Sequence, residues 1–207
     1  RAEGYRSIAI GSADIDGAGA TGTQSGVSYQ TTQQTLSMGW DSIAIGSGAI
    51  ADATFGPNAS GMASTAIGKT AKAKGPNTLA LGANSDAKNG TAVGSGAIVR
   101  NGGLAVGMAA DAGPGSSFFP TSNVALGDNS KVTGGGFNVA LGAMAVAGDS
   151  DLSMQAYRPI TGIAVAGENA VGEVSIGGDS TGQYPGGSVY RRITNLAAGA
   201  ADTDGVN

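Results

Sequence analysis

The chain has 207 residues, of which 38 are glycine, and it contains neither cysteine nor histidine. Hydrophobic residues make up 41%, which is too many for a disordered chain, whereas only 5% are aromatic and 13% charged, which is too few for an ordinary globular core. The net charge of −4 argues against nucleic acid as a partner, and the lack of histidine removes the commonest catalytic base and metal ligand. We therefore expect a thin, repetitive β or fibrous architecture without enzymatic activity, cofactor or metal.

One four-residue phrase recurs along the chain: an apolar residue or Thr, then Ala or Ser, then an aliphatic residue or Met, then Gly. Its copies end at Gly11, Gly39, Gly46, Gly68, Gly82, Gly94, Gly107, Gly127, Gly142 and Gly177. A shorter phrase such as Ala71-Lys72-Ala73 follows three to five residues later. Each repeat therefore predicts a coil of two short strands and two turns, and the coils must stack because none can bury its apolar residues alone.

The alternation within each phrase predicts two unlike strand faces, because successive side chains of a strand point to opposite sides. We expect the large aliphatic residues to fill the core, for example Ile43, Ile45, Leu79, Leu81, Leu104 and Val106. The alanine face would then lie outside, flat enough for another chain to approach closely. On this interpretation Ala80, Ala92 and Ala105 mark a subunit interface, and glycines such as Gly82 stand at strand ends where a side chain would clash.

Four segments interrupt the repeat, near residues 13–34, 54–64, 111–122 and 148–162. In a solenoid such insertions become loops at one edge. The third contains Phe118 and Phe119 and the fourth contains Tyr157 and Arg158, which are candidate ligand contacts. The alternative is that the two phenylalanines form a small satellite core and that Tyr157 anchors its loop. A group of lysines, Lys69, Lys72, Lys74 and Lys88, is either a site for an anion or a glycosaminoglycan, or a solvated outer face that discourages edge pairing.

Two stretches carry a family resemblance. Residues 41–46 (DSIAIG) and 122–127 (SNVALG) resemble the head repeat of YadA-like trimeric autotransporter adhesins. Residues 192–199 (RITNLAAG) and 202–207 (DTDGVN) resemble the neck motif of the same family, apart from Gly205, where the family usually has Ala. The sequence is thus divided into a head over residues 1–190, with the four insertions, and a neck over residues 191–207.

The resemblance implies an all-β fold, a left-handed parallel β-roll of about ten short coils that assembles as a homotrimer. It implies a neck that leads to a coiled-coil stalk, type V secretion, and an outer-membrane anchor outside this sequence, so that the head stands on the bacterial cell surface. The implied function is adhesion to host extracellular matrix or host cells in virulence; the alternative is a structural spacer in a fibre whose binding tip lies elsewhere. In the neck, Arg191 and Arg192 are expected to pair with Asp202 and Asp204 between chains, or else to be solvated surface charges.

Overall fold

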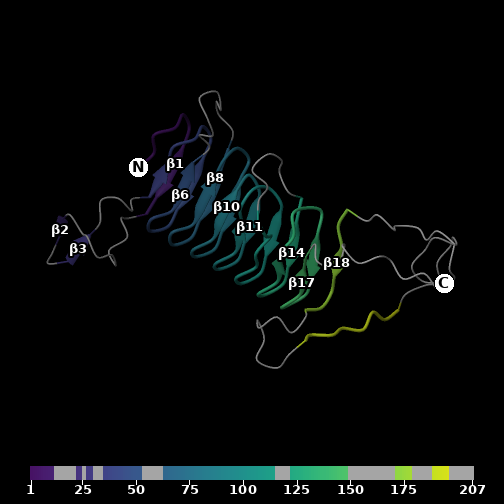
Figure 1. Cartoon of the computed structure of the whole chain (residues 1–207). Helices are drawn as coiled ribbons and strands as arrows, with labels where there is room; N and C mark the ends of the chain where they lie inside the picture. Colours follow the sequence, from purple (N-terminus) through teal and green to yellow (C-terminus); the bar gives the residue numbers. More distant parts are fainter. Residues whose placement is uncertain are drawn as a thin grey trace, which may run out of the picture.

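Short parallel strands alternate between two sheets as the chain advances from coil to coil (Figure 1). The computed structural model describes residues 1–11, 35–52, 63–114, 122–148, 171–178 and 188–195, together with the backbone of residues 22–24 and 27–29. Within these residues there is no helix, and hence none that is long and apolar enough to cross a membrane. The all-β class and the stacked parallel strands agree with the expected β-roll.

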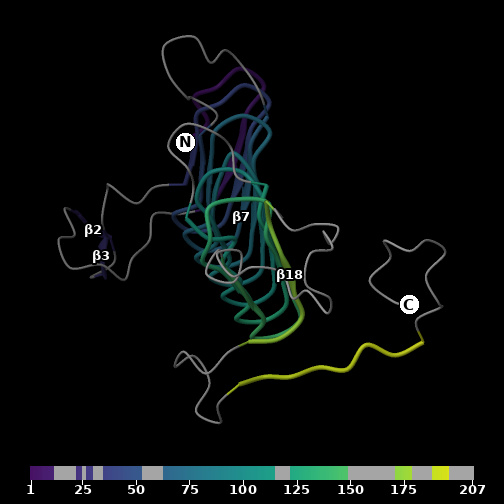
Figure 2. The same cartoon turned by 45° about the vertical axis from the view of Figure 1, so that its right-hand side comes forward.

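The larger sheet has nine strands, and each aligns with its neighbour at equivalent positions of the repeat. For example, Ala44 of one coil is the register partner of Ala66 in the next. Figure 2 shows the coils stacked behind one another, with β18 at the end opposite the N-terminus. In spatial order the sheet contains β1 (Ile8–Ile10), β5 (Ile43–Ile45), β7 (Thr65–Ile67), β9 (Leu79–Leu81), β11 (Thr91–Val93), β13 (Leu104–Val106), β14 (Val124–Leu126), β16 (Val139–Leu141) and β18 (Val174–Ser175).

The second sheet is formed by the return legs of the coils. Its first five strands are β4 (Leu36–Ser37), β6 (Ile50–Asp52), β8 (Lys72–Lys74), β10 (Asp86–Lys88) and β12 (Ile98–Val99). Asp111 continues it, because this residue makes single parallel bridges to Ile98 and Lys131. The strands β15 (Lys131–Val132) and β17 (Val146–Ala147) complete it.

The core between the two sheets consists mainly of alanine. The central residue of most strands is Ala with none of its surface exposed, as in Ala44, Ala66, Ala80, Ala92, Ala105, Ala125 and Ala140 of the nine-stranded sheet and Ala51, Ala73 and Ala87 of the second sheet. The largest fully buried apolar side chains are those of Val99 and Val132. The predicted orientation is therefore wrong: alanine faces inward, and the aliphatic residues, including Ile43, Ile45, Leu79, Leu81, Leu104 and Val106, face outward.

The short turns explain this reversal. A period of two determines which residues share a face, but it does not determine which face is inside. Only four residues, 46–49, connect β5 to β6 in the opposite sheet, and the corresponding turns of other coils are equally short. Two sheets held this close are filled by methyl groups at most positions and by valine at Val99 and Val132, whereas isoleucine and leucine face outward, so residue size decides the orientation.

Glycine ends the strands of the nine-stranded sheet, as predicted. Gly46, Gly68, Gly82 and Gly107 each follow the last residue of a strand, with φ angles of +126°, +136°, +130° and +136°. The NH group of Gly68 donates to the carbonyl of Ile45 in the preceding coil at 2.8 Å. These turns therefore continue the hydrogen bonding between coils beyond the strands.

Buried polar residues form a column just before the strands of the nine-stranded sheet. Ser42, Ser64, Thr78, Asn123 and Asn138 occupy equivalent places in their coils and are at most 2% exposed. The Asn138 NH donates to Oδ1 of Asn123 at 3.1 Å, and Nδ2 of Asn123 donates to the carbonyl of Gly134 at 3.2 Å. Asparagine here pairs backbone groups from neighbouring coils that the strands leave unpaired.

The insertions enter at the turns between the sheets. The predicted third insertion began at Asp111, but Asp111 belongs to the second sheet and the adjacent Ala112 is buried, so the roll extends further than expected. The first insertion contains an antiparallel pair of strands, β2 (Gly22–Gln24) and β3 (Val27–Tyr29), which the sequence interpretation treated as a loop. Most other residues of the four insertions lie outside the described residues.

Candidate binding surfaces of the roll

The outer surface of the nine-stranded sheet is apolar along its whole length. We call its outward-facing residues the aliphatic face. They are Ile8, Ile43, Thr65, Leu79, Thr91, Leu104, Val124, Val139 and Val174 in one column and Ile10, Ile45, Ile67, Leu81, Val93, Val106, Leu126 and Leu141 in the other. None of these positions carries a charge.

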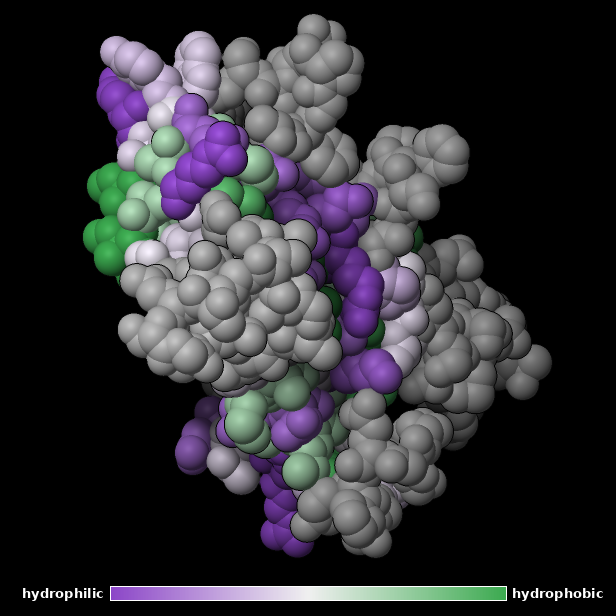
Figure 3. Space-filling model, turned by 90° about the vertical axis from the view of Figure 1, so that its left-hand side faces the viewer, coloured by the Kyte–Doolittle hydropathy of each residue, from purple (hydrophilic) through white to green (hydrophobic). Residues whose placement is uncertain are grey.

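The aliphatic face is accessible in the single chain. Exposure reaches 58% at Ile10, 45% at Leu141 and 68% at Val174, and the remaining positions are partly exposed. Figure 3, which views the molecule from its N-terminal side, shows hydrophobic residues gathered on one side of the visible surface beside a band of hydrophilic residues. An apolar surface this extensive and continuous is unusual on a monomer and is typical of an interface.

The outer surface of the second sheet has the opposite character. Because Ala73 and Ala87 point inward, the residues on either side of them point outward. These outward positions are occupied by Lys72, Lys74, Asp86 and Lys88, and Arg100, Asp111 and Lys131 continue them in the following coils. Leu36, Ile50, Ile98 and Val146 also occupy outward positions of this sheet. The roll therefore has one face without charges, the aliphatic face, and one face that carries charges, the charged face.

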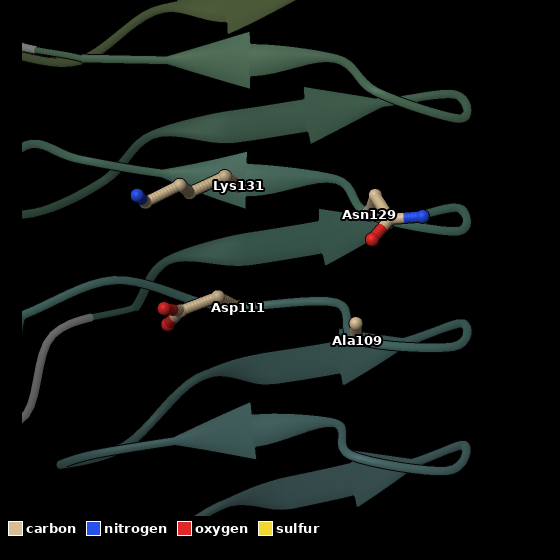
Figure 4. A pocket seen from close by; sticks show the side chains of 4 residues that line it. All are labelled: Ala109, Asp111, Asn129 and Lys131. Atoms are coloured by element: carbon tan, nitrogen blue, oxygen red, sulfur yellow. The ribbon is translucent and has the colours of Figure 1, made fainter. Parts of the chain in front are cut away.

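A hollow of about 340 Å³ opens on the charged side between two coils, lined by Ala109, Asp111, Asn129 and Lys131 (Figure 4). Arg100 Nη1 donates to Oδ1 of Asp111, and the NH of Gly113 donates to the same oxygen at 2.9 Å. The carboxylate of Asp111 is thus already neutralised within the chain. Lys131 has no ion pair within the described part of the structure, so it gives the hollow a net positive charge.

The structure changes the interpretation of the predicted interface residues. Ala80, Ala92 and Ala105 are 0% exposed and lie inside the roll, so their side chains cannot contact another subunit. The outward positions of the same strands are occupied instead by residues such as Leu79 and Val93. The alternation that singled out the three alanines did identify two distinct strand faces, but it assigned them to the wrong sides.

Arg191 contacts its own chain. Its Nη1 donates to the carbonyl of Ile176 at 2.5 Å, and its Nη2 donates to the carbonyl of Ala143. Arg191 belongs to residues 188–195, which follow the roll at its C-terminal end (Figure 2). Its guanidinium therefore pairs with carbonyl groups at that end of the roll. Arg192 is exposed. Asp202 and Asp204 lie outside the described residues, so the predicted ion pairs of the neck stay a prediction.

The predicted ligand contacts Phe118, Phe119, Tyr157 and Arg158 also lie outside the described residues. A different aromatic pair lies at the N-terminal end of the roll. The rings of Tyr5 and Trp40 meet edge to face with centroids 6.2 Å apart, and Arg6 lies over the Tyr5 ring and pairs with Asp41 at 2.7 Å. Tyr5 stands one coil before Trp40 at the same turn, a repeat relationship that sequence analysis did not use.

Comparison with known proteins gives one match. Residues 59–85 match the YadA head domain repeat in two copies. This segment contains β7, β8 and β9, so the match falls on the regular part of the roll. No curated protein and no solved structure matches the chain. The parallel two-sheet roll and the matched repeats together support a YadA-like head, a class of domain found in surface adhesins.

Proposed function

We propose that the chain is the head of a bacterial surface adhesin and that it assembles as a homotrimer through the aliphatic face. The observation that carries this proposal is the uncharged apolar surface that follows the nine-stranded sheet from β1 to β18. Three rolls that turn this surface toward a common axis would bury it, and closed rotational symmetry gives each copy the same environment. The charged face would then remain in contact with solvent.

The proposed function is attachment to host extracellular matrix or host cells. The head-repeat match supports an adhesive role, and the lack of histidine and cysteine favours binding over catalysis. A trimer presents each surface three times, so weak contacts gain from a raised effective concentration. The proposal includes a left-handed roll, a neck over residues 191–207, and anchoring in the outer membrane through a region outside this sequence.

The oligomeric state tests the assembly. We expect light scattering on the 207-residue chain at micromolar concentration to give three times the 19.9 kDa mass of one chain. The variant Val93→Lys/Val106→Lys places two charges on the aliphatic face and should run as a monomer. The matched control Ile50→Lys/Ile98→Lys places the same charges on the charged face and should stay trimeric. A parent chain that is monomeric at this concentration contradicts the proposal.

A structural spacer is the second candidate, because a regular roll also lengthens a fibre. The four insertions favour the adhesin, since a spacer has no need of them. Attachment to a panel of matrix proteins and host cells should be measured for the parent and for chains that lack residues 53–62 or 115–121. Binding by the parent that a deletion removes supports the adhesin, whereas a trimer that binds nothing in the panel supports the spacer.

A further inference from the structure

The positive charge of the chain is concentrated on one face. Residues 63–114 contain five cations, Lys69, Lys72, Lys74, Lys88 and Arg100, and two acids, Asp86 and Asp111, which gives +3, although the whole chain carries −4. The sequence has five lysines, these four and Lys131, and all of them belong to the second sheet or to the turn that leads into it. We call Lys72, Lys74, Lys88, Arg100 and Lys131 the basic stripe.

The stripe runs along the axis of the roll. Lys74 and Lys88 are register partners on neighbouring strands, and Arg100 occupies the next place in the same column. Neighbouring strands lie about 4.8 Å apart, so three cations follow one another at this interval. Like charges directly opposite one another destabilise a sheet. Asp52, the register partner of Lys74 on its other side, offsets part of this repulsion, and an anion that lies across the three cations would relieve the rest.

Three acids on this face, Asp52, Asp86 and Asp111, neutralise the five cations of the stripe only in part. Lys74 lies 3.6 Å from Asp86, and Arg100 pairs with Asp111. Pairs as exposed as Lys74 and Asp86 are weak in water, so a polymer of higher charge density can compete with them. Lys72 and Lys131 form no ion pair within the described residues, and Lys131 faces the hollow beside Asp111 (Figure 4).

We propose that the basic stripe binds a linear sulfated polysaccharide of the heparan sulfate class. A row of flexible ammonium and guanidinium groups along a straight rod suits a linear polymer with a negative group on each unit. The described positions of this face include no aromatic side chain, so they offer no platform for stacking nucleic-acid bases and lack the large anchors of protein hot spots. This inference names a ligand class for the proposed adhesin and rests on that proposal.

Binding to immobilised heparin tests the inference. We expect the 207-residue chain to bind at low salt and to weaken steeply as salt rises, because each contact releases counterions. Lys72→Gln/Lys131→Gln should raise the Kd about tenfold and lower the slope of log K against log salt by about two. The matched control Arg1→Gln/Arg6→Gln removes the same charge from the N-terminal turn and should bind like the parent.

A second measurement needs no variant. Heparin should slow the acetylation of Lys72, Lys74, Lys88 and Lys131 in the parent chain, as followed by mass spectrometry, and desulfated heparin should not. The inference is overturned if the parent does not bind, if the two double variants bind equally, or if desulfated heparin or an acidic peptide of equal charge competes as well as heparin. Duplex DNA that competes equally would show a general polyanion surface and would also overturn it.

The heparin test can fail independently of the tests of assembly and attachment. A trimeric chain that attaches to cells but ignores heparin would contradict only the stripe. A chain that binds heparin but stays monomeric and attaches to no cell or matrix protein would contradict the proposed function.

Discussion

At the scale of single residues, the glycine after most strands of the nine-stranded sheet is required by the neighbouring coil. A Cβ on Gly82 would lie 2.5 Å from the carbonyl oxygen of Gly94, at a φ of +130° that side chains rarely adopt. Gly82→Val should therefore lower the free energy of unfolding by about 1–3 kcal/mol, measured by urea denaturation. Gly136→Ala is the control, because nothing lies within 4 Å of a Cβ there. Equal stability of the two variants would contradict this account of the turn.

Asn123 makes a second prediction at this scale. Its side chain is fully buried and serves two backbone groups, the NH of Asn138 and the carbonyl of Gly134. Asn123→Ala leaves both without this partner, so the free energy of unfolding should fall by about 1–3 kcal/mol. The exposed neighbour Ser122→Ala should change it by less than about 0.5 kcal/mol. A thermal melt of Asn123→Ala that coincides with that of Ser122→Ala would show that the buried column contributes nothing.

At the scale of the strand, neighbouring residues should lose very different amounts of stability on the same substitution. In β11, Ala92 is buried between the sheets and Thr91 faces outward. Ala92→Leu adds three carbon atoms to a space sized for a methyl group, so it should cost about 1–3 kcal/mol of stability. Thr91→Leu should cost less than about 0.5 kcal/mol, because its side chain extends away from the core. Chemical denaturation of both variants measures this difference, and a larger loss for Thr91→Leu would restore the original orientation.

The turns between the sheets predict where a deletion is tolerated. Three residues, 101–103, separate Arg100 from β13 in a regular coil. In the next coil Gly113 occupies the place of Arg100, and removing residues 115–121 leaves Pro114, Ser122 and Asn123 before β14, which is the same number. We therefore expect the shortened chain to keep the circular dichroism of the parent and to melt within a few degrees of it. Loss of the β signal would mean that the removed segment supports the core.

At the scale of the whole molecule, the sequence predicted the repeat but not which side chains of each strand face the core. The spacing of glycines such as Gly68 and Gly82 located the strands and turns correctly, because a strand end that abuts the next coil admits only glycine. The assignment of Ala80 and Leu81 to opposite faces was also correct. Which of them points inward depends on the separation of the two sheets, a property of the closed coil that no single phrase reveals. The basic stripe was visible as a group of lysines, but Arg100 and Lys131 joined it only when the coils were stacked.

The same geometry links stability to assembly. A core made of alanine buries little apolar area per residue, whereas the larger aliphatic side chains remain exposed until another chain covers them. For a trimer, a hundredfold rise in concentration should stabilise each chain by about 2 kcal/mol, or roughly 4–8 °C in Tm. Calorimetry of the parent at about 1 and 100 μM measures this shift, as an order-of-magnitude expectation from the same linkage. Val93→Lys/Val106→Lys should melt lower and at a Tm that does not depend on concentration, whereas Ile50→Lys/Ile98→Lys should keep the dependence. A parent Tm that is the same at both concentrations would mean that the single roll is stable with its aliphatic face uncovered.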